Sequence, residues 1–107
     1  MQKIIDAVKN GDMDTLRECI ESGADVNEKD IAVDQRCALH WAVINANFIA
    51  LDWLLGNGAD IEAIDWYRHT PLHLACIHGR PRVLRYLLDN GANPLARYEG
   101  RERESQS

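Results

Sequence analysis

A short motif returns at near-constant intervals, and it constrains the fold more than any other feature of the chain. Gly23-Ala24-Asp25, Gly58-Ala59-Asp60 and Gly91-Ala92-Asn93 are separated by 35 and then 33 residues. Leu39-His40-Trp41-Ala42 returns after 33 residues as Leu72-His73-Leu74-Ala75. Self-similarity at a fixed period of about 20–50 residues is the sequence signature of a repeat architecture. The sequence therefore predicts three similar units stacked on one another.

Each unit combines two short helical patterns with a segment that has no period. In the third unit, apolar residues from Leu72 to Cys76 have helical spacing, and this pattern ends at Gly79. A second pattern runs from Val83 to Leu88 and stops at Asn90-Gly91, where glycine can supply a left-handed helix cap. The segment after each glycine motif has no helical period, so we expect a turn or hairpin there. Neither helix can bury its apolar face inside one unit, whereas stacking the units buries both.

These patterns predict an all-α solenoid of three helix-turn-helix units joined by hairpin-like loops. The repeat domain is expected over residues 1–98, with units at about 1–30, 31–64 and 65–98. The two extra residues of the first spacing fall within 31–34. Residues 99–107 carry charged side chains and no apolar ones, so we expect a flexible tail there. The chain is either a complete small protein or a piece of a longer array.

The third unit carries a family signature. Thr70-Pro71-Leu72-His73-Leu74-Ala75 resembles the T-P-L-H-x-A motif of ankyrin repeats, whose period is about 33 residues, and the resemblance covers about residues 4–98. The second unit departs from it, because Cys37-Ala38 replaces Thr-Pro, and we expect a looser helix start there. Gln35 and Arg68 stand where the family usually has a hairpin glycine. If φ is positive at these positions, each costs about 1 kcal/mol.

Two acidic residues in the first unit replace large apolar ones in the others. Asp6 is equivalent to Trp41 and Leu74, and Glu18 is equivalent to Trp53 and Tyr86. A solenoid needs a polar face where no neighbour stacks. The first unit is therefore expected to be an N-terminal cap.

Composition and charge narrow the class of protein. Three cysteines are too few for a disulfide framework, which favours an intracellular, cytoplasmic or nuclear location. No apolar run approaches the ~20 residues of a membrane span. The net charge of −5 disfavours binding to nucleic acid. Residues 1–66 carry a net charge of −8 and residues 67–107 of +3. This asymmetry either serves solubility or steers an acidic partner to the basic end.

Metal binding and catalysis find little support in the sequence. Cys37 with His40, and His73 with Cys76, have the i, i+3 spacing of metal ligands on one helix face. The two cysteines lie on opposite sides of equivalent histidines, so four ligands would not converge on one ion. The resemblance assigns these histidines a structural role at the helix start. No nucleophile elbow, dinucleotide motif or phosphate-binding loop is present, so we expect no enzyme and no cofactor.

The segment Trp66-Tyr67-Arg68-His69 is the most distinctive candidate site. Trp, Tyr and Arg carry much of the binding energy in protein interfaces. Trp41 and Trp53 lie in helical phase with leucines, whereas Trp66 has loop residues as neighbours. Its ring either folds back over an adjacent hairpin or faces a partner.

The resemblance implies a concave binding face made of hairpin tips and the first helix of each unit. Alignment places on this face Trp66, Tyr67, His69, Ile77 and His78 in unit three, Arg36, Ile44 and Asn45 in unit two, and Lys9 and Asn10 in unit one. Ile44 and Ile77 would be apolar side chains that face water, as expected of a contact surface.

We therefore expect a monomeric, non-catalytic protein-binding module that acts as an adaptor, inhibitor or scaffold. One alternative is a regulatory or structural segment of a larger, possibly enzymatic, protein. Another is self-assembly through the acidic and basic ends. Repeats of this kind bind unrelated partners, so the fold alone does not identify one.

Overall fold

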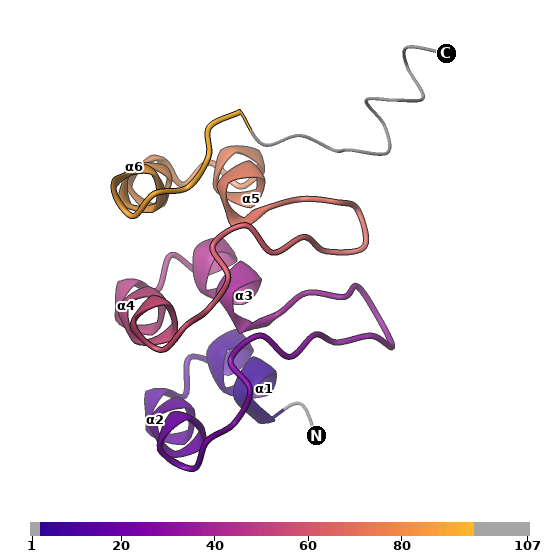
Figure 1. The fold of residues 1–107 in the computed structure, drawn as a ribbon, viewed down its shortest axis with the longest axis vertical. Coiled ribbons are helices and arrows are strands. Elements are labelled where there is room, and N and C mark those ends of the chain that lie inside the picture. The colour runs from indigo at the N-terminus through magenta and orange to yellow at the C-terminus, as the bar shows by residue number, and fades with distance from the viewer. Residues whose placement is uncertain (1–2, 96–107) are drawn as a thin grey trace.

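The structure, a computed structural model, describes residues 3–95 and contains six α-helices in that range. They are α1 (Lys3–Asn10), α2 (Met13–Glu21), α3 (Ala38–Ile44), α4 (Phe48–Gly56), α5 (Pro71–Ile77) and α6 (Pro81–Asp89). The helices form three stacked pairs, and the loops between pairs project to one side of the stack (Figure 1). The predicted all-α solenoid of three helix-turn-helix units is confirmed. The predicted tail, 99–107, lies outside the described residues.

In the described part of the chain, side chains with oxygen acceptors cap the starts of α2, α4 and α5. Asp12 accepts a hydrogen bond from the backbone N–H of Thr15, and Asn47 does the same for Ala50 at the equivalent position of the second unit. Such N-caps pair backbone N–H groups that have no partner inside the helix. The third unit has Arg80 at this position, and α6 starts instead with Pro81, whose φ is preset for a helix.

The first helices of units two and three start in related ways. In both, a histidine Nδ1 accepts the backbone N–H three residues earlier, from Cys37 at 3.0 Å and from Thr70 at 3.1 Å. The Thr70 hydroxyl also accepts from the backbone N–H of His73 at 3.2 Å. Cys37 presents a sulfur at the corresponding place, and sulfur is a weaker acceptor. The histidine contact thus survives the departure from Thr-Pro, although one partner is poorer.

Within residues 3–95, three non-glycine residues adopt positive φ angles. Gln35 and Arg68, in equivalent hairpin positions, have φ of 58° and 66°, which confirms the left-handed conformation considered for them. Ala46 has φ of 53° in the tight turn between α3 and α4, where the other units have Gly11 and Gly79. A side chain with a Cβ is strained in this region, so the second unit holds two strained residues.

The core runs continuously through the stack. Its largest fully buried side chains come from all three units: Ile4, Ile5, Val8, Leu16, Leu39, His40, Val43, Leu51, Leu54, Leu74, Val83 and Leu87. Helix α3 packs against both α1 and α5 and is therefore enclosed on two sides. Asp6 and Glu18 are exposed, whereas Leu74, a counterpart of Asp6, is fully buried and Tyr86, a counterpart of Glu18, is half-buried. This burial pattern matches the polar-for-apolar exchange in the first unit.

Neighbouring loops are also joined by side chains. Asn27 accepts from the Asp60 backbone N–H at 2.7 Å and donates to the Gly58 carbonyl at 3.1 Å. Glu62, the equivalent residue one unit later, accepts from the Asn93 backbone N–H at 2.7 Å. Two different side chains therefore make the same inter-unit contact, and only the amide can also donate.

Candidate protein-binding surface

The hairpin between α4 and α5 is built around a buried carboxylate. The Asp65 side chain is fully buried and accepts from the backbone N–H groups of Tyr67 and His69, both at 2.9 Å. It also accepts from Arg36 Nε at 3.1 Å, an ion pair that reaches across from the preceding hairpin. Because the carboxylate pairs two amides of its own loop, it fixes the path of the chain at the hairpin tip.

A buried histidine joins the helices to the same hairpin. His40 is fully buried, and its Nε2 lies 3.0 Å from the Ala63 carbonyl and 3.2 Å from the His69 carbonyl. Since Nδ1 accepts from the Cys37 N–H, the ring is neutral with its proton on Nε2. Burial lowers the pKa of His40 and raises the pKa of the Cys37 thiol. Both groups therefore stay uncharged, in a structural role.

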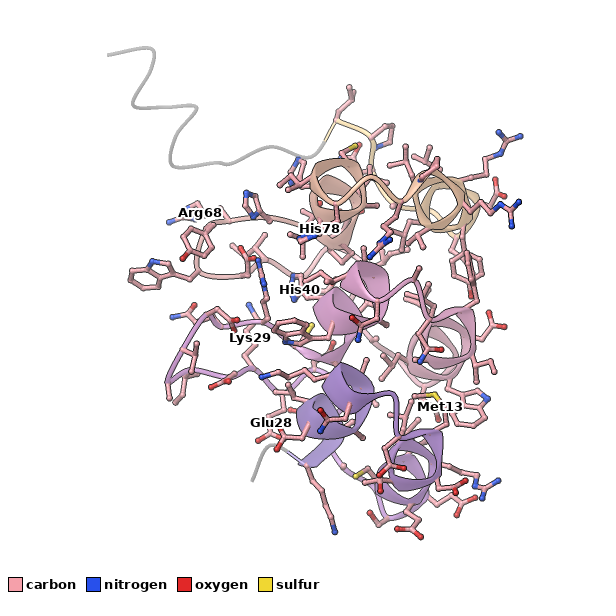
Figure 2. All side chains as sticks on the ribbon, turned by 180° about the vertical axis from the view of Figure 1, so that it is seen from behind. Met13, Glu28, Lys29, His40, Arg68 and His78 are labelled. Carbon is pink, nitrogen blue, oxygen red and sulfur yellow. The ribbon has the colours of Figure 1, made fainter. Side chains whose placement is uncertain are left out.

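The hairpin between α2 and α3 lies beside the hairpin between α4 and α5, because one lysine and backbone groups connect them. Lys29 Nζ donates to the Ile64 carbonyl at 2.6 Å, and the Trp66 N–H donates to the Asp34 carbonyl at 2.8 Å. Figure 2 shows Lys29 between the hairpins and Arg68 at the outer end of one of them, remote from His40 at the helices. The frame of Asp65, Arg36, Lys29, His40 and His69, here called the hairpin frame, holds both tips in place.

Four large apolar side chains project from these tips into solvent. Ile31 is 81% exposed, Val33 is 73%, Trp66 is 64% and Tyr67 is 58%. We call these four residues the tip patch. The exposure of Trp66 favours the second of the two orientations considered for its ring, the one open to a partner. Apolar groups gathered on an exposed surface are typical of interaction sites.

Ile31 and Val33 were not among the residues selected from the sequence. A signal for them exists, because the first spacing of 35 residues exceeds the second by two and the extra residues lie within 31–34. The insertion lengthens the hairpin between α2 and α3 and carries these side chains beyond the core. Repeat insertions map to loops, often on the binding face.

Two other predicted site residues belong to the hairpin frame rather than to the free surface. The Arg36 side chain is only 17% exposed because it pairs with Asp65. The His69 side chain is 21% exposed, and its ring stacks on Tyr67 with centroids 5.9 Å apart. Burial lowers the pKa of His69, against the opposing effect of Asp65. These two side chains support the tip patch from beneath.

The remaining predicted residues lie at the C-terminal ends of α3 and α5, and they differ in exposure. Ile77 is 55% exposed and His78 is also exposed, as expected. Ile44 is half-buried and packs against the core, so the expectation that it faces water like Ile77 is not met. Asn45 is exposed, but its Nδ2 donates to the Val8 carbonyl at 3.1 Å and thereby links α3 to α1.

The half-buried Trp41 ring on α3 has a cation on each of two neighbouring segments. Lys9 Nζ lies 5.0 Å from the centroid of this ring, and Arg36 Cζ lies 5.4 Å from it. These distances are within the range of cation–π contacts. Lys9 and Arg36 therefore flank an aromatic ring on the path from the first helices to the hairpins.

Between residues 3 and 95, no group of three or more His, Cys, Asp or Glu side chains is placed to hold a metal ion. In the same range, no helix is long and apolar enough to cross a membrane. Cys19 is buried in the core, and all three cysteines are free thiols.

Comparison with known proteins agrees with this architecture. A family model described as ankyrin repeats in three copies matches residues 4–98. Human protein phosphatase 1 regulatory subunit 27 is 35% identical over 89 residues, which cover 83% of this chain and 57% of that protein. I-Kappa-B like protein C2 of Microplitis demolitor bracovirus is 33% identical, covering 98% and 60% respectively. Drosophila melanogaster E3 ubiquitin-protein ligase Ufd4 is 35% identical, covering 92% of this chain and 4% of that protein. With its stacked pairs and projecting hairpins, the chain belongs to the ankyrin-repeat family.

Proposed function

We propose that this chain is a non-catalytic protein-binding module, and that the tip patch is the centre of its contact surface. The observation that carries the proposal is the exposure of Ile31, Val33, Trp66 and Tyr67 above a hydrogen-bonded frame. Aromatic side chains on a fixed loop lose little conformational entropy when they bind, so their burial contributes more to affinity. A partner protein with a complementary apolar surface would cover them.

The relatives support a role in binding other proteins and do not point to one biological setting. One is named as a regulatory subunit of a phosphatase, and another contains a similar segment within a much larger ligase. The chain spans about half to two thirds of the shorter relatives and a small part of the larger one. The same surface could therefore work in an adaptor, an inhibitor or a scaffold, or in a regulatory segment of a larger protein. An intracellular location, supported by three free cysteines, belongs to this proposal.

Photo-cross-linking tests the assignment of the surface. A benzophenone-bearing phenylalanine analogue at Tyr67 should cross-link a discrete partner in cells, which mass spectrometry then identifies. The same analogue at Asp89, an exposed position on α6 away from the hairpins, is the matched control. Equal cross-linking from both positions would count against the tip patch as the contact surface.

Affinity measurements with the identified partner then test the energetics. Replacing both Trp66 and Tyr67 by Ala should weaken binding by about several hundredfold, because interface hot spots contribute about 2 kcal/mol or more each. The matched control is Leu88→Ala, an exposed apolar residue on α6. An unchanged dissociation constant for the double variant would refute the proposal.

A further inference from the structure

A second surface lies at the opposite ends of the helices, where a tight turn joins the two helices of each pair. A hollow of about 610 Å³ lies between the turns of the first and second pairs. Another of about 390 Å³ lies between the turns of the second and third pairs. Ala46 and Phe48 line both hollows, so they form one open depression, here called the turn groove. Its parts are of the size that proteins use to bind small groups, about 300–1,000 Å³.

The floor of the turn groove is apolar and partly exposed. Phe48 is 38% exposed and Ile49 is 56% exposed, and Val83 and Pro81 complete the apolar lining of the second hollow. The Phe48 ring packs edge-on against Tyr86, with centroids 5.6 Å apart. This contact fixes the ring at the mouth of the groove, so an incoming apolar side chain would meet a preformed surface.

The charge of the groove is opposite to the charge of the protein. Lys9 lines the first hollow, and Arg80 and Arg82 line the second. None of the described residues that line either hollow is acidic, although the chain has a net charge of −5. Arg80 is held in place because its Nε donates to the Ile44 carbonyl at 3.0 Å. Three cations around an apolar floor favour a ligand that is both anionic and apolar.

We propose that the turn groove binds a short acidic peptide segment that carries one large apolar side chain. The apolar side chain would cover Phe48 and Ile49, while flanking carboxylates would face Arg80 and Arg82. Nucleic acid is disfavoured, because three cations on an acidic protein give too little positive surface to follow a phosphate backbone.

This inference rests on the proposed function only in that both treat the chain as a binding module. The two surfaces are separated by at least the length of α5, seven residues or about 10 Å. A partner could engage the tip patch alone, the turn groove alone, or both. Variants confined to one surface therefore distinguish a failure of one proposal from a failure of the other.

Selection from random twelve-residue peptides displayed on phage, followed by binding of the synthetic peptides to the full chain, tests the groove. Enriched peptides should combine a large apolar residue with at least two carboxylates. Arg82→Glu should weaken their binding by about fivefold or more, because it reverses a charge that faces the ligand. A carboxylate in the first turn of α6 is also favourable for the helix, so the variant should stay folded.

Arg85→Glu provides a matched control for the charge. Arg85 is exposed on the same helix, three residues beyond Arg82, and does not line the groove. Its reversal changes the net charge of the protein equally and should alter peptide affinity by less than about twofold. Equal losses for both variants would mean that only overall charge matters, which would overturn the site.

Substitutions of two isoleucines distinguish peptide binding at the apolar floor of the groove from binding at the tip patch. Ile49→Ser should weaken peptide binding by about tenfold, since it removes most of one exposed apolar contact. Ile31→Ser, at the tip patch, should leave the affinity unchanged. Peptides that respond to Ile31→Ser but not to Ile49→Ser would overturn the groove and support the tip patch instead.

Two further outcomes would also reject the inference. One is a selection that enriches no peptides with carboxylates near an apolar residue. The other is binding of fluorescent single-stranded DNA that Arg82→Glu abolishes, which would assign the groove to nucleic acid.

Discussion

The two ends of the same hairpins obey different physical constraints. At the base, the hairpin frame consists of polar and charged groups that are buried or half-buried and paired, with the buried Asp65 and His40 at its centre. At the tips, apolar groups such as Trp66 and Ile31 are exposed. This is the reverse of the usual distribution, in which charges face water and apolar groups are inside. The contrast indicates that the base stabilises the fold while the tips are free to serve binding.

The largest expected effect comes from the base of the hairpins. Asp65→Ala leaves Arg36 and two backbone N–H groups without their acceptor, and should lower the free energy of unfolding by about 3–5 kcal/mol. That is a large share of the ~5–15 kcal/mol that stabilises a typical domain. Urea unfolding followed by circular dichroism measures the loss.

Asp60→Ala is the control for this prediction. Among the described residues, the exposed Asp60 carboxylate accepts a hydrogen bond only from the Glu62 N–H, at 2.9 Å. Its removal should cost about 1 kcal/mol. Similar losses for the two variants would show that burial of Asp65 adds nothing to the stability of the stack.

The pH dependence of the free energy of unfolding should distinguish the buried His40 from exposed histidines. Burial lowers the pKa of His40 below its unfolded value of about 6.5. As the pH falls, the unfolded chain therefore binds more protons than the folded chain does. Stability is therefore full above the unfolded pKa, and it declines as pH drops from about 6.5 toward the folded pKa, by at most about 1.4 kcal/mol per pH unit for one group. Unfolding midpoints measured between neutral and mildly acidic pH report this slope.

The variant His40→Gln should reduce the pH slope, with the part that remains coming from His69, whose pKa burial also lowers. His78→Gln, at an exposed position outside the hairpin frame, serves as the comparison. A slope that His40→Gln leaves intact would mean that His40 does not control the acid sensitivity of the fold.

A smaller effect is expected in the tight turn of the second unit. Ala46→Gly relieves a positive φ of 53° but increases the freedom of the unfolded chain, and the net gain should be about 0.5 kcal/mol. Ala32→Gly, in the exposed hairpin loop and without a positive φ, should give no gain. Thermal unfolding of both variants makes the test, and destabilisation by Ala46→Gly would argue against strain at this turn.

The smallest effect on stability is expected at the tips. Replacing Trp66 and Tyr67 by Ala should change the free energy of unfolding by less than about 0.5 kcal/mol, because exposed side chains remove little surface from water on folding. A loss of 2 kcal/mol or more, comparable with a core truncation, would erase the distinction between base and tips. The same urea titration used for Asp65→Ala provides this measurement.

Much of the fold follows from the sequence because periodicity is a local and repeated signal. The glycine motifs and the Leu-His helix starts specify three units, and the exchange of Leu74 for Asp6 predicts the exposed position in the first unit. The exposure of Trp66 was one of two alternatives, since a loop aromatic has no period that fixes its direction. Ile31 and Val33 were not predicted to be site residues, because apolar residues in an insertion are equally compatible with packing in the core.

The sequence alone determined the number of units, their helices and the hairpin positions, because each unit repeats the same local instructions. Only the tertiary structure decided how polar side chains cross between units. Arg36 reaches Asp65 over 29 positions, and Lys29 reaches the Ile64 carbonyl over 35. Stacking brings these groups within hydrogen-bond distance, and no local pattern encodes that proximity. The same stacking made Arg36 and His69 parts of the hairpin frame and left the apolar tips exposed.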